Sequence, residues 1–116
     1  MAEFYVSVSA DGVMELPAAL LPHFGGSAVV CFGKDSSLLL CTQLQWDDFL
    51  ARLRESSAKS QAASRVFVTT AVQVDLSDGC LTLPPHLRAH AAITSAARIE
   101  FDGQSCHLYR WACTEP

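Results

Sequence analysis

The 116-residue sequence predicts a single α+β domain that is rich in β-strands and contains two repeats around one core. Hydrophobic residues form 50% of the chain and charged residues 17%, a composition that excludes a disordered protein. Two segments have the same order of an alternating strand, an Asp-Gly turn, a second alternating strand and a proline. An amphipathic helix is expected between them. Together these features favour a duplicated, strand-rich architecture.

The first repeated segment covers residues 6–17 and the second covers residues 72–84, with one extra residue before the second turn. Their turns contain Asp11-Gly12 and Asp78-Gly79. An Asp-Gly pair between alternating stretches is a strong hairpin signal, because glycine adopts a positive φ at little cost. The match extends beyond the prolines to two leucines and two histidines: Leu20 and Leu87, His23 and His90.

Each proline is expected to end a strand and to open a short helix. Strand pairs then follow at residues 28–32 and 38–41, and at 97–101 and 106–111. A unit of about 45 residues cannot bury its apolar faces alone. We therefore expect one domain over residues 1–116, in which repeats at about 4–41 and 66–111 share an interleaved, pseudo-twofold sheet.

Residues 42–65 connect the repeats and contain the amphipathic helix. Its apolar face carries Trp46, Phe49, Leu50 and Leu53, and Thr42 with Gln45 fits a capping box. Asp47 and Asp48 are expected in its first turn, and Arg52 and Arg54 in its last turn. Trp46, Phe49 and Leu53 are candidate helix-packing or oligomer contacts. Residues 56–64 fit a linker or a second, weak helix, and residues 65–74 are expected to resume a long strand-like stretch.

The formal net charge is −4, and neither sign forms a block along the chain. This balance weighs against a general nucleic-acid coat or a protein that binds anionic membranes, since both are normally basic. No apolar run approaches the ~20 residues of a transmembrane helix, and the start of the chain lacks the pattern of a signal peptide. The five cysteines are odd in number and include no Cys-x-x-Cys pair. We expect free, mostly buried thiols in a reducing cytosol.

The sequence favours neither an enzyme nor a metal protein. His86 and His90 are four residues apart on an expected helix, and Cys80, Cys106 and His107 are the residues that would complete a site. A surface histidine and a packing histidine are the simpler interpretation. The chain has no Gly-x-Ser-x-Gly nucleophile elbow and no P-loop. We expect no catalytic residues, no metal and no cofactor.

The order and spacing of these elements resemble the MraZ family, from about Phe4 to Trp111. The resemblance rests on several short matches along the chain: Gly12 to Leu16-Pro17, Gly79 to Leu83-Pro84, Leu39-Leu40 leading into Gln45-Trp46, the run from Arg65 to Ala71, and Leu87-Arg88 to Thr94. It implies a tandem swapped-hairpin barrel of the AbrB type in a cytoplasmic, nucleoid-associated transcription factor. The implied partners are DNA repeats upstream of the protein's own operon and further copies of the chain, commonly in a ring.

The family's turns read Asp-x-x-Gly-Arg, and their arginine is the group offered to DNA. Gly12 and Gly79 match the turn glycines, but Val13 and Cys80 occupy the two arginine positions. Each lost bidentate base contact costs roughly 1–3 kcal/mol of discrimination. Two hypotheses follow. The chain is an MraZ-like regulator with weak or altered DNA contacts, or it is a diverged module of the same fold that binds a paralogue or another protein.

Overall fold

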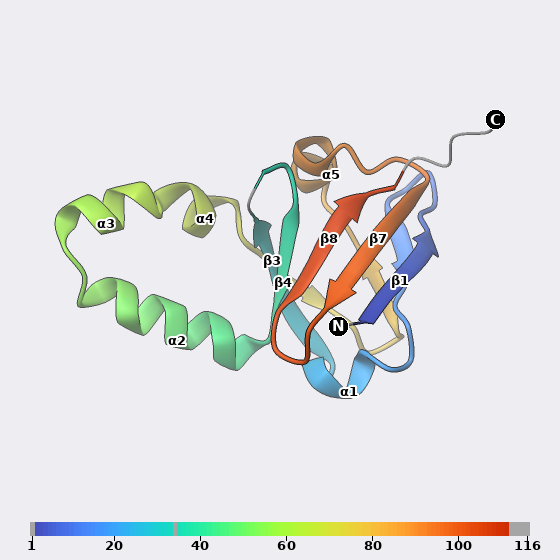
Figure 1. Cartoon of the computed structure of the whole chain (residues 1–116), viewed down its shortest axis with the longest axis horizontal. Coiled ribbons are helices and arrows are strands. Elements are labelled where there is room, and N and C mark those ends of the chain that lie inside the picture. The colour runs from blue at the N-terminus through green and yellow to red at the C-terminus, as the bar shows by residue number, and fades with distance from the viewer. Residues whose placement is uncertain (1, 34, 112–116) are drawn as a thin grey trace.

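The computed structural model describes residues 2–33 and 35–111 and is an α+β domain rich in antiparallel strands (Figure 1). Its strands are β1 (Ala2–Ser7), β2 (Val13–Glu15), β3 (Ser27–Phe32), β4 (Leu38–Cys41), β5 (Val72–Asp75), β6 (Cys80–Thr82), β7 (Ala96–Phe101) and β8 (Cys106–Arg110). Its helices are α1 (Leu21–Phe24), α2 (Gln43–Arg54), α3 (Ala58–Ala63), α4 (Arg65–Thr70) and α5 (Pro85–Ala91).

The strands form a six-stranded sheet in the order β1-β7-β8-β4-β3-β5 and a two-stranded sheet of β2 and β6. The strands that flank each Asp-Gly turn pair mainly with distant partners. Strand β1 pairs with β7, β5 pairs with β3, and β2 pairs with β6. Within the described residues no closed barrel is seen. The expectation of two local hairpins is thus wrong for most of their length, although Val8 and Met14 form one bridge beside the first turn.

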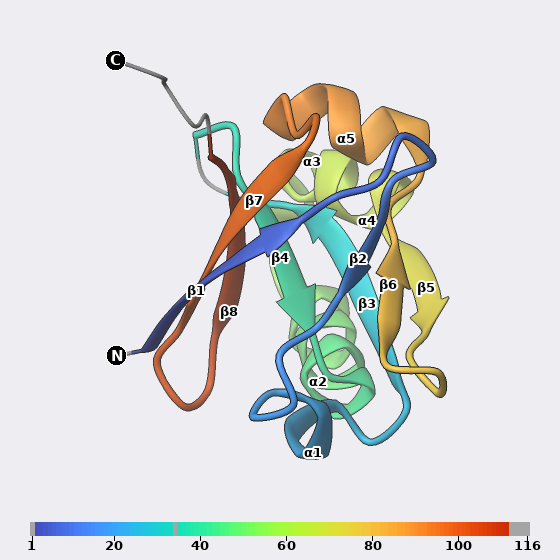
Figure 2. The same ribbon diagram turned by 90° about the vertical axis from the view of Figure 1, so that its right-hand side faces the viewer.

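The core lies between the two sheets and is closed by α1 and α5 (Figure 2). Met14 and Leu81 face each other at the centre of the two-stranded sheet, and they are 1% and 0% exposed. Leu20 precedes α1 and Leu87 lies in α5, and both are fully buried. The apolar residues expected at matching positions therefore supply the centre of one continuous core.

Helices α2, α3 and α4 form an arm that projects from the body (Figure 1). The capping box at the start of α2 is confirmed: Gln45 N donates to Thr42 Oγ1, and Thr42 N donates to Gln45 Oε1. Asp47 and Asp48 lie beyond the first turn, contrary to expectation. Asp47 accepts a hydrogen bond from Gln43, and Asp48 forms an ion pair with Arg52. Each carboxylate therefore interacts with a side chain one helical turn away.

The long strand expected at residues 65–74 is wrong in its first half, because Arg65–Thr70 is the helix α4. The hydroxyls of Thr69 and Thr70 donate to the backbone carbonyls of Arg65 and Val66, so local hydrogen bonds support the helix despite its β-branched residues. Residues 58–63 form the helix α3, capped by Ser57, and of the two interpretations of this segment the helix is correct.

Candidate nucleic-acid interface at the two glycine turns

The sheet of β2 and β6 places the two candidate arginine positions on the same small ladder. Val13 pairs with Thr82, and Cys80 pairs with Glu15. Met14 and Leu81 point into the core, so these four residues form the opposite, half-buried to exposed face. Val13 and Cys80 start their antiparallel strands at opposite ends of the ladder. The two turns therefore lie apart, one beside α5 and one toward α1 (Figure 2).

The first turn is tightly enclosed. Gly12 has a φ of 86°, and its amide donates to Ser9 O over 2.9 Å. Its own carbonyl accepts from Leu83 N at 2.9 Å. A Cβ atom at this position would lie 2.9 Å from Leu83 O and 2.9 Å from Arg88 Cδ. Both the backbone conformation and the space thus require glycine here.

Arg88 of α5 holds this turn in place. Its Nη1 donates to Ala10 O at 3.0 Å, and its Nη2 donates to Thr94 O at 3.2 Å. The guanidinium therefore joins the first turn to the segment that follows α5. In the sequence, Arg88 stands out only as part of the family resemblance, because nothing in the local pattern shows that a helix side chain reaches a turn so distant in the chain.

The second turn is held by carboxylates and has more room. Gly79 has a φ of 79°, and a Cβ atom there would meet only Leu21 Cδ1 of α1, at 3.7 Å. Asp78 accepts a hydrogen bond from Cys80 N at 3.0 Å. Asp75 accepts from Ser77 N at 2.8 Å, and this backbone hydrogen bond lowers the pKa of the Asp75 carboxyl. The second turn is thus held by two acidic side chains, and its glycine lies beside an apolar side chain of α1.

The charges around the two turns are mainly negative. Asp11, Glu15, Asp75 and Asp78 are exposed near them, and the one cation that contacts a turn in the described structure, Arg88, is engaged with backbone carbonyls. Negative charges at both turns would repel phosphate groups there. The exposed cations Arg54, Lys59 and Arg65 lie instead on the arm.

The three candidate contacts on α2 separate into two environments. Trp46 and Phe49 have ring centroids 5.4 Å apart and line a groove between the arm and the large sheet. Leu53 lines a different hollow of about 670 Å³ between α2 and the helices α3 and α4. All three are half-buried, so the stripe packs within the arm and against the body while keeping part of its surface exposed.

The histidines and cysteines considered for a metal site do not converge. His86 Nε2 lies 3.1 Å from Thr70 O, whereas His90 stacks on the Phe32 ring with centroids 3.6 Å apart. Across residues 2–33 and 35–111, no group of three or more His, Cys, Asp or Glu side chains is placed to hold a metal ion.

The thiols behave as core groups in the described part of the chain. Cys31, Cys41 and Cys106 are free and buried, as expected, and Cys80 is free and half-buried. Cys113 lies outside the described residues. Burial, followed by the nearby Cys41, raises the pKa of Cys106 to about 12. Hydrogen bonding to Cys41 and burial raise the pKa of Cys31.

The chain is similar along most of its length to proteins named as transcriptional regulators, and no protein-family model matches it. These relatives are MraZ proteins. The one from Ligilactobacillus salivarius is 29% identical over 80% of this chain and 68% of its own. Those from Thermoanaerobacter sp. strain X514 and Heliobacterium modesticaldum are 25% and 26% identical, over 97% of this chain and 80% and 83% of their own. These matches support membership of the MraZ family.

No helix in the described part of the chain combines the length and the apolar character needed to cross a membrane.

Proposed function

We propose that the chain is a cytoplasmic MraZ-type transcriptional regulator that binds DNA through contacts other than the usual turn arginines. The observation that carries this proposal is the similarity to MraZ regulators over 97% of the chain. The same relatives are named as regulators and not as enzymes.

We also propose that its fold is a tandem, AbrB-type arrangement of two repeats with exchanged first strands. The strand order β1-β7-β8-β4-β3-β5 supports this, because exchanging each strand with its counterpart in the other repeat gives the same order read from the opposite edge. The β2–β6 ladder has the same property, with Met14 opposite Leu81 at its centre. His23 and His90 also occupy matching places, each against a phenylalanine at the end of a matching strand, Phe101 and Phe32.

The arm is the candidate for the altered DNA contact. Residues 43–70 contain four basic and three acidic residues, whereas the whole chain has eight basic and twelve acidic residues. The arm is therefore the part of the chain with a positive balance. Arg65 is exposed at the start of α4 and is the most direct residue to test, and Arg110, exposed at the end of β8, supplies a control of equal charge.

The test is fluorescence anisotropy with DNA from upstream of the protein's own gene, beside scrambled DNA, at low and at physiological salt. We expect preference for the upstream DNA that persists at physiological salt. Arg65→Glu should weaken this binding about tenfold or more, because it removes a direct contact with DNA. Arg110→Glu should weaken it less, because it changes only the long-range attraction between protein and DNA. Equal and salt-sensitive binding to both DNAs, or no binding, would overturn the proposal.

A second candidate is a module of the same fold that does not bind DNA and assembles with a paralogue, another protein or further copies of itself. The acidic surroundings of both turns and the half-buried Val13 and Cys80 favour this alternative. Its test is co-purification from the native host with Val13→Asp and Cys80→Asp variants, together with the mass of the assembly in solution. Unchanged partners and unchanged mass would argue against a role for these positions.

A further inference from the structure

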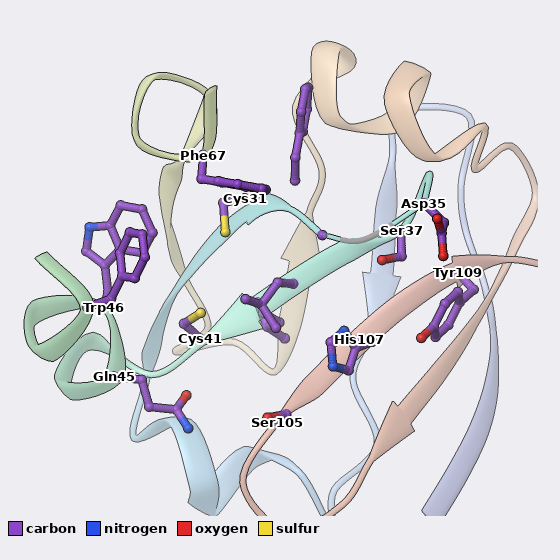
Figure 3. A pocket seen from close by; sticks show the side chains of 15 residues that line it. Cys31, Asp35, Ser37, Cys41, Gln45, Trp46, Phe67, Ser105, His107 and Tyr109 are labelled. Carbon is purple, nitrogen blue, oxygen red and sulfur yellow. The ribbon is translucent and has the colours of Figure 1, made fainter. Parts of the chain in front are cut away.

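A groove of about 700 Å³ lies between the arm and the outer face of the large sheet. Trp46 and Phe49 of α2 and Phe67 of α4 form its helical side, while Leu39 of β4 and His107 of β8 lie on its sheet side. Figure 3 shows Trp46, Phe67 and His107 around the groove. The volume is within the range of about 300–1,000 Å³ that is typical of sites for small molecules. The aromatic lining is what such a site uses to hold an apolar ligand.

The two ends of the groove differ in chemistry. Trp46 and Phe67 stand at one end, close to the buried thiols of Cys31 and Cys41 (Figure 3). Asp35 and Tyr109 lie toward the other end (Figure 3). A ligand that fills the groove therefore meets aromatic rings at one end and a negative charge at the other.

The described lining of the groove carries one negative charge. Among its described lining residues there is no lysine or arginine, and Asp35 is the one carboxylate. Arg98 lies over the Tyr109 ring, 4.6 Å from its centroid, but it pairs with Glu3 and Glu100. A positive ligand would gain from Asp35 and from the faces of the aromatic rings, whereas a negative ligand would gain from neither.

We propose that this groove is a binding site for a lipophilic aromatic cation. Its rings pack between Trp46, Phe67 and the sheet, and its positive charge lies toward Asp35. The site is separate from the two glycine turns, and the proposal does not depend on how the chain contacts DNA. A bound molecule would contact both the arm and the large sheet.

Two ions of nearly the same shape and opposite charge test the proposal. Tetraphenylphosphonium and tetraphenylborate are titrated into the purified full-length protein by calorimetry. We expect saturable binding of one phosphonium per chain, with the borate bound about tenfold more weakly or not at all. Quenching of Trp46 fluorescence in a Trp111→Phe background should follow the same curve and locate the ion. Equal affinity for the two ions, or no saturable phosphonium binding, would overturn the proposal.

Substitutions on exposed positions then assign the site. Phe67→Ala should weaken phosphonium binding about fivefold or more, whereas Val66→Ala, on the same helix but outside the groove, should leave it unchanged. Asp35→Asn should lower phosphonium affinity and reduce the preference over borate, and asparagine suits its φ of 55°. Equal effects of Phe67→Ala and Val66→Ala, or an unchanged preference in Asp35→Asn, would refute the assignment.

Discussion

Alanine substitution at the two turn glycines separates backbone strain from lack of space. Gly12 and Gly79 have similar positive φ values, 86° and 79°, so alanine is strained to a similar degree at both. This strain costs roughly 1–2 kcal/mol. At Gly79 the new methyl group would be at an ordinary contact distance, 3.7 Å, from Leu21 Cδ1. At Gly12 it would be 2.9 Å from Leu83 O, a backbone atom that cannot move without disturbing the ladder.

Forcing such a contact in a packed region adds roughly 1–3 kcal/mol. We therefore expect Gly12→Ala to lower the free energy of unfolding by about 2–5 kcal/mol and Gly79→Ala to lower it by about 1–2 kcal/mol. Urea unfolding followed by circular dichroism measures both. Gly103→Ala, with a φ of 97° and nothing within 4 Å of the new Cβ, is the reference for strain alone. Equal losses for Gly12→Ala and Gly79→Ala would show that the enclosure of the first turn is not tight.

Three further predictions concern side chains. Arg88→Ala should lower the free energy of unfolding by roughly 1.5–3 kcal/mol, because two charge-assisted hydrogen bonds are lost, and Arg110→Ala should change it by less than about 0.5 kcal/mol in the same urea assay. Cys80 should react with a disulfide reagent at pH 8 faster than Cys106, whose pKa of about 12 keeps it protonated, and equal rates in single-cysteine variants would contradict this. Hydrogen bonds from Ser105 N and Gln104 N lower the pKa of the Asp102 carboxyl below 3.8. The stability that these bonds contribute is therefore present above pH 3.8 and is lost as the pH falls through the pKa of the folded state. Asp102→Asn should flatten the acid loss of stability below about pH 4, and an unchanged slope would contradict this prediction.

The sequence predicted most elements and the burial of matching leucines, because hydrophobic alternation, turn glycines and helix caps are local signals. The capping box of Thr42 and Gln45 and the strand at residues 38–41 were predicted with their observed positions. The helix at Arg65–Thr70 was missed, since its β-branched residues have strand propensity and its support comes from hydroxyl groups bonding one turn back.

Features that depend on distant partners were beyond a local pattern. The pairing of β1 with β7, the reach of Arg88 to Ala10, and the groove under the arm each join segments far apart in the chain. The positions of the turn glycines could be predicted as a candidate site. Their unequal space could not, because it depends on which residues the other half brings to each turn.

The pairing of β1 with β7 has a consequence for how the molecule folds. Strand β1 contains the first described residues, yet Ala2 pairs with Phe101 near the other end of the chain. During synthesis on a ribosome, β1 can pair only after β7 (Ala96–Phe101) has emerged, and its apolar side chains have no native partner until then. Folding should accordingly be slow for a domain of this size. At high concentration, an unpaired β1 can pair with β7 of a neighbouring molecule and yield a domain-swapped dimer.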